Sequence, residues 1–192
     1  MQPDTTVTGG DKRDRILDSA LILFLRYGVK RTSIDDIARQ AGIAKGTVYL
    51  SFDSKAALFA AIADRLCAST LSNAEQIASD VTPPTERIVE VLDCYIGQTH
   101  RLVSQSPHIA ELTASKEALA TQAFETLDRQ IRAVLATLLK EAGIGQDGAA
   151  DMLVAAGIGT LHTGDTAAQP YRVRLSAMVK TLVTGLSCDA KA

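Results

Sequence analysis

Residues 32–59, TSIDDIARQAGIAKGTVYLSFDSKAALF, contain the local signals that decide the fold. Ser33 and Asp36 have the spacing of a capping box, in which a hydroxyl and a carboxylate satisfy the free amides at the start of a helix. Gly42 accepts the positive φ that a sharp bend requires. These signals predict one short helix before Gly42, a tight bend, and a second short helix at about 44–52.

This arrangement predicts a helix-turn-helix, which we place at about 33–52. The second helix of such a motif needs an apolar side that packs inward and an outer side that fits the major groove of DNA. The side chains available for the inward side are Ile43, Val48 and Phe52. The side chains left for the outer side are Lys45, Gly46, Thr47, Leu50 and Ser51.

The rest of the chain has helical periodicity and no strand pattern. Aromatic residues make up only 4% and Trp is absent, which favours an aliphatic core between helices. We expect an all-α protein with about nine helices: an N-terminal three-helix bundle with the helix-turn-helix, then a larger helical domain. The predicted helices lie at about 11–27, 33–41, 44–52, 54–79, 84–105, 107–114, 116–142, 147–161 and 170–186, with a loop at 162–170. The predicted domains are a disordered lead-in at 1–10, a DNA-binding domain at 11–57 and a helical domain at 58–192.

The formal net charge of −2 does not by itself indicate a nucleic-acid partner. Positive charge is nevertheless segregated along the chain. Residues 11–65 hold ten Lys or Arg and seven Asp or Glu, whereas residues 66–192 hold ten and fourteen. The basic surplus therefore coincides with the predicted helix-turn-helix, as expected of a domain that binds DNA.

Three observations bear on the compartment. No apolar run reaches the ~18 residues of a membrane-spanning helix. The first ten residues, MQPDTTVTGG, lack the basic and apolar regions of a signal peptide. The three cysteines are scattered, odd in number and form no CxxC motif, which favours a reducing environment. We expect a cytoplasmic protein with no membrane partner.

The residues quoted above resemble the signature of the tetracycline-repressor (TetR) family of transcriptional regulators. More than a dozen positions match without a gap, as TxxDDIAxxAGIAKGTVYxxFxSKxxLF over residues 32–59. The resemblance covers about residues 11–66, and beyond them it extends only to helical content and length. It implies a homodimeric regulator, in most cases a repressor, that binds a palindromic operator in double-stranded DNA and is released by a small molecule.

The resemblance also implies roles for single residues. Those matching phosphate contacts are Thr32, Ser33, Tyr49 and Lys55, and those matching base-edge contacts are Lys45, Gly46 and Thr47. The chain departs from the family pattern at Leu50, where an aromatic or larger polar residue is common, and at Ser51, where His is common. Ser51 can still donate to a phosphate. Leu50 has no hydrogen bond to offer and could contact only a thymine methyl group.

The helical domain offers candidates for a ligand and for a partner copy. Tyr95, His100 and His108 lie near the corner between two predicted helices. In similar proteins a small ligand is held nearby, between the helices that correspond to segments 54–79 and 116–142. A surface role remains the alternative for the histidines. Apolar residues at helical spacing near the C-terminus form a candidate dimer interface, with packing inside the protomer as the alternative. These residues are Leu175, Met178, Val179, Leu182 and Leu186.

Other functional classes find less support in the sequence. The three histidines have neither i, i+3 nor i, i+4 spacing and no neighbouring cysteine, so we expect no metal site and no cofactor. No Ser-His-Asp or Cys-His arrangement is recognisable, which argues against an enzyme. Two alternatives to a repressor remain: a transcriptional activator of the same fold, and a helical adaptor that binds proteins.

Overall fold

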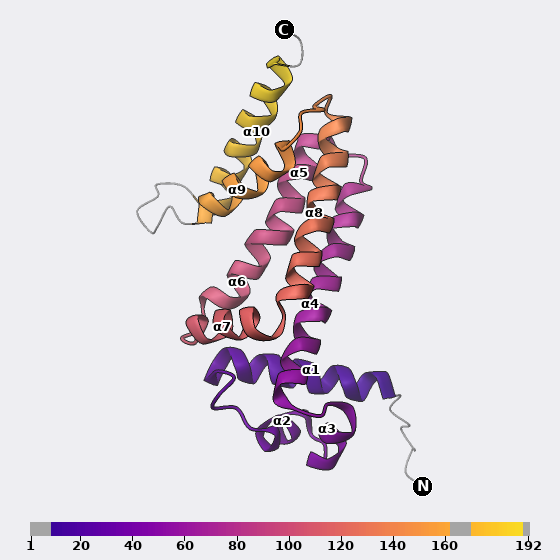
Figure 1. Cartoon of the computed structure of the whole chain (residues 1–192), viewed down its shortest axis with the longest axis vertical. Helices are drawn as coiled ribbons and strands as arrows, with labels where there is room; N and C mark the ends of the chain where they lie inside the picture. The colour runs from indigo at the N-terminus through magenta and orange to yellow at the C-terminus, as the bar shows by residue number, and fades with distance from the viewer. Residues whose placement is uncertain (1–8, 162–169, 190–192) are drawn as a thin grey trace. The chain divides into compact units, whose positions relative to one another are not determined.

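The computed structural model describes residues 9–161 and 170–189, and within these two ranges the chain is helical with no strand. The helices are α1 (Gly9–Tyr27), α2 (Ile34–Ala41), α3 (Lys45–Ser51), α4 (Lys55–Ala78), α5 (Pro84–Leu92), α6 (Gln98–Ser104), α7 (Ile109–Leu119), α8 (Thr121–Glu141), α9 (Ala149–Leu161) and α10 (Tyr171–Asp189) (Figure 1). A π-helical segment, Asp93–Gly97, joins α5 and α6 into one continuous helix. The described part of the chain therefore holds nine continuous helices, and the predicted all-α class is confirmed.

Two predicted segments fall largely outside the described residues. Of the expected lead-in at 1–10, residues 1–8 are not described, and Gly9 and Gly10 already belong to α1. Of the expected loop at 162–170, residues 162–169 are not described.

The chain divides into two compact units, each with its own core. The first unit comprises residues 1–66 together with 103–123, and the second comprises 67–102 together with 124–192. The predicted boundary at 57/58 had assigned residues 103–123 to the larger domain. The structure instead groups α7 with α1, because contacts between residues about 80 positions apart hold them together.

The contacts that bind α7 into the first unit are both apolar and polar. Leu112 is buried in the same core as the helices around the helix-turn-helix. A carboxylate oxygen of Glu111 accepts a hydrogen bond from the backbone N–H of Lys30 at 2.5 Å. The hydroxyl of Ser106 donates to the carbonyl of Leu25 at 2.6 Å. Residues between the two sequence segments belong to the second unit, so no local pattern could reveal this packing.

The core of the first unit is aliphatic, as expected from the scarcity of aromatic residues. Its buried members repeat at helical spacing on the inner sides of α1, α2, α3 and the start of α4. They include Ile16, Ala20, Phe24, Ile37, Val48, Phe52, Leu58 and Ile62. Removing a large member such as Phe24 would leave a cavity and cost about 3–5 kcal/mol of folding free energy.

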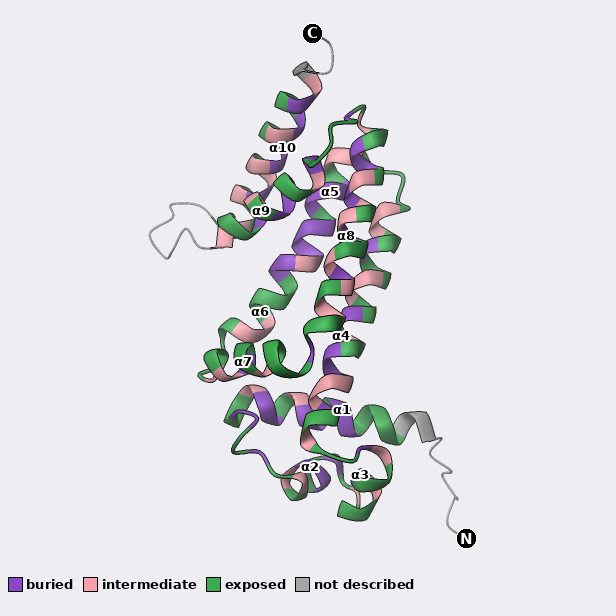
Figure 2. Ribbon diagram, viewed as in Figure 1, coloured by how far each residue is buried: buried purple, intermediate pink, exposed green. Residues whose placement is uncertain are grey.

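The second unit is built from the second half of α4, most of the continuous α5–α6 helix and of α8, and from α9 and α10. Its largest fully buried side chains are Ile88, Leu92, Ile131, Leu135, Leu138, Leu153 and Leu175. α10 packs against both α9 and α5. Figure 2 shows the buried residues as purple stripes along these helices, with exposed residues on the opposite sides.

The π-helical segment has a charged residue at its start. The buried carboxylate of Asp93 accepts hydrogen bonds from the guanidinium of Arg101 at 2.9 and 3.1 Å and from that of Arg172 at 3.2 Å. A Cβ on Gly97 would lie 2.2 Å from a carboxylate oxygen of Asp93, so only glycine fits there. The single helix predicted at 84–105 is thus continuous, but it changes from α-helical to π-helical geometry over one turn, beside a buried ion pair.

One predicted helix break is displaced. The expected break lies at residue 115, between helices at 107–114 and 116–142, whereas α7 continues to Leu119 and the observed break is at Ala120. No glycine or proline marks this break in the sequence. Ala120 is buried, and its backbone N–H still donates to the carbonyl of Lys116.

Among the described residues, no helix combines the length and the apolar character that crossing a membrane requires.

Candidate nucleic-acid interface

The bend between α2 and α3 is fixed by local caps. The Ser33 hydroxyl accepts a hydrogen bond from the Asp36 backbone N–H at 3.1 Å, and the Asp36 carboxylate accepts one from the Ser33 backbone N–H at 3.1 Å. The predicted capping box is confirmed. Hydrogen bonds from the hydroxyl and backbone N–H of Ser33 lower the pKa of Asp36. At the other end, Gly42 has φ +64°, the left-handed conformation that the bend requires.

α3 is a helix of seven residues whose orientation is set by its inner side. Val48 is completely buried, and Phe52, which follows the helix, is also buried. The guanidinium of Arg13 lies 4.2 Å from the centre of the Phe52 ring and donates to the carbonyl of Ser51 at 3.1 Å. These contacts hold both the middle and the end of α3 against α1.

The opposite side of α3 is open. Lys45, Gly46, Tyr49 and Leu50 are exposed, and Thr47 and Ser51 are half-buried. A Cβ added to Gly46 would meet no atom within 4 Å. These six residues are the predicted DNA contacts of α3, and each has accessible surface. Their contacts with DNA stay a prediction.

Lys45 is engaged by a residue that was not among the predicted site residues. Its ammonium group lies 3.0 Å from a carboxylate oxygen of Asp35 on α2, and both side chains are about half exposed. The hydrogen bond and the charge of Asp35 raise the pKa of Lys45. The ion pair therefore holds the side chain of Lys45, which is predicted to contact a base edge, against α2.

The other predicted phosphate contacts lie around the start of α2. The Thr32 hydroxyl is buried and donates to the carbonyls of Gly28 at 2.7 Å and Leu23 at 3.3 Å. This hydrogen bond satisfies a carbonyl at the end of α1, and a contact of Thr32 with a phosphate stays a prediction. The Lys55 ammonium donates to the carbonyls of Lys30 at 3.1 Å and Thr32 at 2.9 Å. An ammonium has three N–H donors, so one remains available on Lys55.

The arginines of α1 also support the site, and the sequence-based prediction missed them. Arg13 supports α3 as described above, and Arg15 donates to the carbonyl of Ala41 at 2.5 Å, at the end of α2. A signal for both was present in the run of basic residues Lys12, Arg13 and Arg15 in the first turns of α1. Their partners, however, are backbone carbonyls 26 and 38 residues away, which a sequence pattern does not specify.

Tyr95, His100 and His108, the candidate ligand residues, are distributed over the two units. The Tyr95 hydroxyl donates to a carboxylate oxygen of Asp128 on α8 at 2.9 Å, and burial together with this carboxylate raises the pKa of Tyr95. His100 is exposed in the second unit, and His108 is half-buried in the first unit. Within the second unit, Tyr95 therefore has a structural partner, and the role of all three residues in ligand binding stays a prediction.

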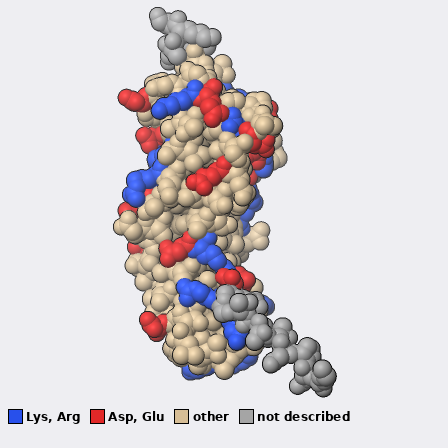
Figure 3. All heavy atoms as spheres, turned by 90° about the vertical axis from the view of Figure 1, so that its right-hand side faces the viewer, with Lys and Arg blue, Asp and Glu red and all other residues tan. Residues whose placement is uncertain are grey.

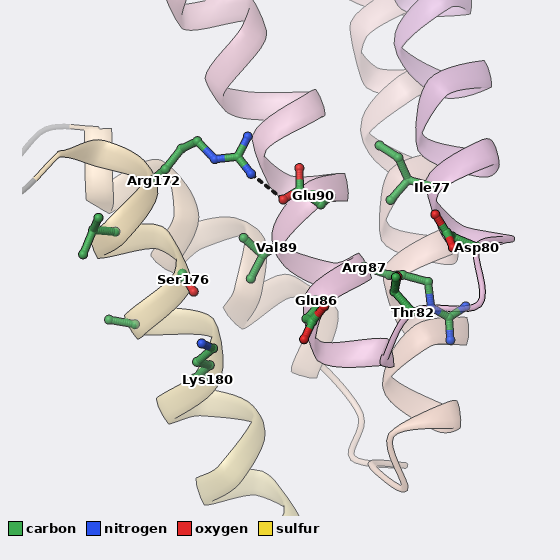
Figure 4. Close-up of a pocket in the computed structure, with 12 residues that line it drawn as sticks. Ile77, Asp80, Thr82, Glu86, Arg87, Val89, Glu90, Arg172, Ser176 and Lys180 are labelled. Atoms are coloured by element: carbon green, nitrogen blue, oxygen red, sulfur yellow. Dashed lines mark hydrogen bonds and ion pairs between the residues drawn. The ribbon is translucent and has the colours of Figure 1, made fainter.

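A cavity of about 860 Å³ lies in the second unit, between the end of α4, the start of α5 and one side of α10 (Figure 4). Arg172 of α10 reaches across to Glu90 of α5, and the two form an ion pair. Arg87 is buried beside the cavity, where its guanidinium donates to the carbonyl of Ala78 and to Glu141, both at 2.5 Å. Tyr95, His100 and His108 do not line this cavity.

The candidate dimer residues of α10 divide into two groups. Leu175, Val179 and Leu186 are buried within the second unit, so these three side chains stabilise the protomer itself. Met178 and Leu182 are half-buried and keep some accessible surface. The more exposed apolar side chains nearby are Met152 and Ile158 of α9 and Val173 of α10.

Several charged side chains on the described surface form ion pairs. Arg65 binds Asp18 at 2.6 Å in the first unit, and Arg132 binds Asp128 at 2.8 Å in the second. Figure 3 accordingly shows basic and acidic side chains close to one another on the face that it draws, rather than one continuous basic surface.

Comparison with known proteins also points to the segment that contains α2 and α3. Residues 16–62 match the family model described as bacterial regulatory proteins, tetR family. The chain is 36% identical over 108 residues to the uncharacterized HTH-type transcriptional regulator YvdT of Bacillus subtilis (strain 168), covering 56% of this chain and 54% of that protein. It is 32% identical over 88 residues to the HTH-type transcriptional repressor KstR2 of Mycolicibacterium smegmatis, covering 46% and 43%. The matches thus span about half the length of these curated relatives.

Solved structures show the same fold over nearly the whole chain. The reduced form of NemR from E. coli superposes with a TM-score of 0.69 at 20% identity, covering 90% of this chain and 97% of that one. The TetR family transcriptional regulator PfmR from Thermus thermophilus gives a TM-score of 0.63 at 18% identity, covering 90% and 99%. At these identities the likeness shows the fold alone.

Proposed function

We propose that this chain, whose residues 16–62 match the model for bacterial regulatory proteins of the tetR family, is a DNA-binding transcriptional regulator. In this proposal it is a repressor that binds a palindromic operator as a homodimer and is released by a small molecule, which would place it in the cytoplasm with the DNA. The observation that carries the proposal is the geometry of α3, which is anchored on one side by Val48 and Phe52 and open on the other.

A dimer is part of the proposal because one short recognition helix offers few contacts. A twofold dimer presents two such helices to half-sites about 34–36 Å apart, one turn of DNA, and so doubles the contacts on a palindrome. The exposed apolar residues Met152, Ile158 and Val173 support an association surface on α9 and α10. Exposed apolar surface of this kind is typical of protein interfaces.

A releasing ligand requires a site in the second unit and a connection to the first. The cavity of about 860 Å³ has the size of a small-molecule site and supports the first requirement. α4, α6 and α8 each have residues in both units, so the chain itself provides the connection. A ligand that prefers one of two conformations would change operator affinity with a coupling free energy of about 1–3 kcal/mol.

An activator of the same fold is the second candidate. It is favoured by one observation, a 25% identity over 120 residues to the HTH-type transcriptional activator FasR of Mycolicibacterium smegmatis. Repressor and activator differ in the sign of their effect on transcription. A promoter-reporter assay with and without the protein separates them, since a repressor lowers the reporter signal.

The binding experiment is a titration of duplexes from the upstream region of the chain's own gene at several salt concentrations. We expect the logarithm of the binding constant to fall linearly with the logarithm of salt, with a slope of about −0.9 per phosphate contacted. A binding constant that does not change with salt would contradict the proposal. A Lys140→Ala variant is the matched control, because it removes one positive charge from an exposed position of α8 in the second unit, away from the cavity, and should leave the slope unchanged.

A further inference from the structure

The exposure of Leu50 is unusual for a large apolar side chain. It lies near the end of α3 and 89% of it is accessible, whereas Val48, two residues earlier, is completely buried. Two residues correspond to a rotation of about 200° around a helix, so Leu50 points almost directly away from the core. Leu50 therefore buries little apolar surface in the first unit, and its side chain is accessible to a partner.

The surroundings of Leu50 make it a protrusion. One helical turn before it lies Gly46, which has no side chain and no neighbour within 4 Å of a built Cβ. Lys45 is drawn toward α2 by Asp35. The Ser51 hydroxyl points back along α3 and donates to the carbonyl of Thr47 at 3.3 Å. Leu50 thus stands beside a flat patch and has no neighbour that covers it.

The chemistry of Leu50 restricts what it can recognise. Its side chain has neither a hydrogen-bond donor nor an acceptor, so it cannot read the polar atoms of a base edge. On the major-groove edge of the four base pairs, the C5-methyl group of thymine is the apolar feature. We propose that Leu50 is a specificity-determining residue that contacts a thymine methyl group in each half-site. This inference rests on the proposed function, namely that α3 enters the major groove.

The test replaces thymine by deoxyuridine, which lacks only this methyl group. An operator is first selected from random duplexes with the wild-type protein. Each thymine of one half-site is then replaced in turn, and dissociation constants are measured by fluorescence anisotropy at fixed salt. The contact of one methyl group is worth about 0.8 kcal/mol, which corresponds to about a fourfold change in affinity.

For the wild type we expect one position at which deoxyuridine weakens binding about fourfold, and about fifteenfold when both half-sites are replaced. In Leu50→Ala this dependence should disappear at that position, with responses at other positions unchanged. Leu50→Met keeps an apolar side chain of similar volume and should keep the dependence. Because Leu50 is exposed, both variants should fold like the wild type, which circular dichroism verifies.

The two failures are distinguishable. If the wild-type protein selects no duplex, the proposed function itself fails. If it selects an operator but no deoxyuridine position weakens binding, or if Leu50→Ala keeps the same position-dependent loss as the wild type, the role of Leu50 is wrong while DNA binding stands.

Discussion

At the scale of single residues, the ion pair between Lys45 and Asp35 separates binding from stability. Both side chains are about half exposed, so solvent screens the pair and it adds little to folding stability. A base-edge contact is worth about 1–3 kcal/mol of binding free energy. Lys45 therefore offers a position at which the two quantities can be measured independently.

We expect Lys45→Ala to weaken operator binding by about 1–3 kcal/mol while leaving the free energy of unfolding nearly unchanged. Fluorescence anisotropy gives the first quantity and urea denaturation the second. Lys116→Ala on α7 is a control that removes the same charge from an exposed helical position. Equal operator affinity for Lys45→Ala and the wild type would remove Lys45 from the interface.

At the scale of elements, the two glycines that bracket the start of α3 have opposite roles. Gly42 has φ +64°, and a Cβ there would lie 3.3 Å from the Arg15 guanidinium. Gly46 lies inside α3 with open space around it. Gly42 is required by the left-handed backbone conformation of the bend. Gly46 weakens the helix, and its lack of a side chain keeps this part of the surface of α3 flat.

We expect Gly42→Ala to lower the free energy of unfolding by about 1–2 kcal/mol, because an alanine is strained in the left-handed conformation. Gly46→Ala should raise it by up to about 0.5–1 kcal/mol, since alanine favours the helix. If bases approach Gly46, the added methyl should nevertheless cost about 1–3 kcal/mol of operator binding through over-packing. Thermal or urea denaturation with a binding titration checks both. A Gly46→Ala protein that is more stable and binds equally well would show that no base approaches there.

At the scale of the whole molecule, the proposed regulator requires two copies. The exposed side of α9 carries Met152 and Ile158, and the buried leucines of α10 are used inside the protomer. The association surface proposed from the structure is therefore centred on α9 rather than on Leu175, Val179 and Leu186.

We expect Ile158→Glu to weaken dimerisation at least about tenfold, because a twofold interface would lose the exposed part of two isoleucine side chains and would have to bury two carboxylates. Sedimentation velocity over a concentration series measures this change, and circular dichroism should show unchanged helical content. Val81→Glu is the matched control, since Val81 is exposed in the turn between α4 and α5. An unchanged dimer in Ile158→Glu would exclude this side of α9 from the interface.

What could be predicted from the sequence was mostly what neighbouring residues decide. The Ser33–Asp36 capping box, the bend at Gly42 and the burial of Val48 all depend on residues within about one helical turn, and each was predicted correctly. The π-helical segment at Asp93 was not predicted, since one of the two arginines that bind the buried Asp93 carboxylate, Arg172, lies 79 residues later in the sequence.

The sequence alone therefore determined the helix-turn-helix, the all-α class and the identity of the residues on the outer side of α3. The tertiary structure alone decided which of the polar candidates are engaged: Thr32 at the end of α1, Lys55 at loop carbonyls and Lys45 with Asp35. It also decided that α7 belongs with the first unit. The physical reason is that helix periodicity and caps are local, whereas side-chain hydrogen bonds and core packing depend on segments that only folding brings together.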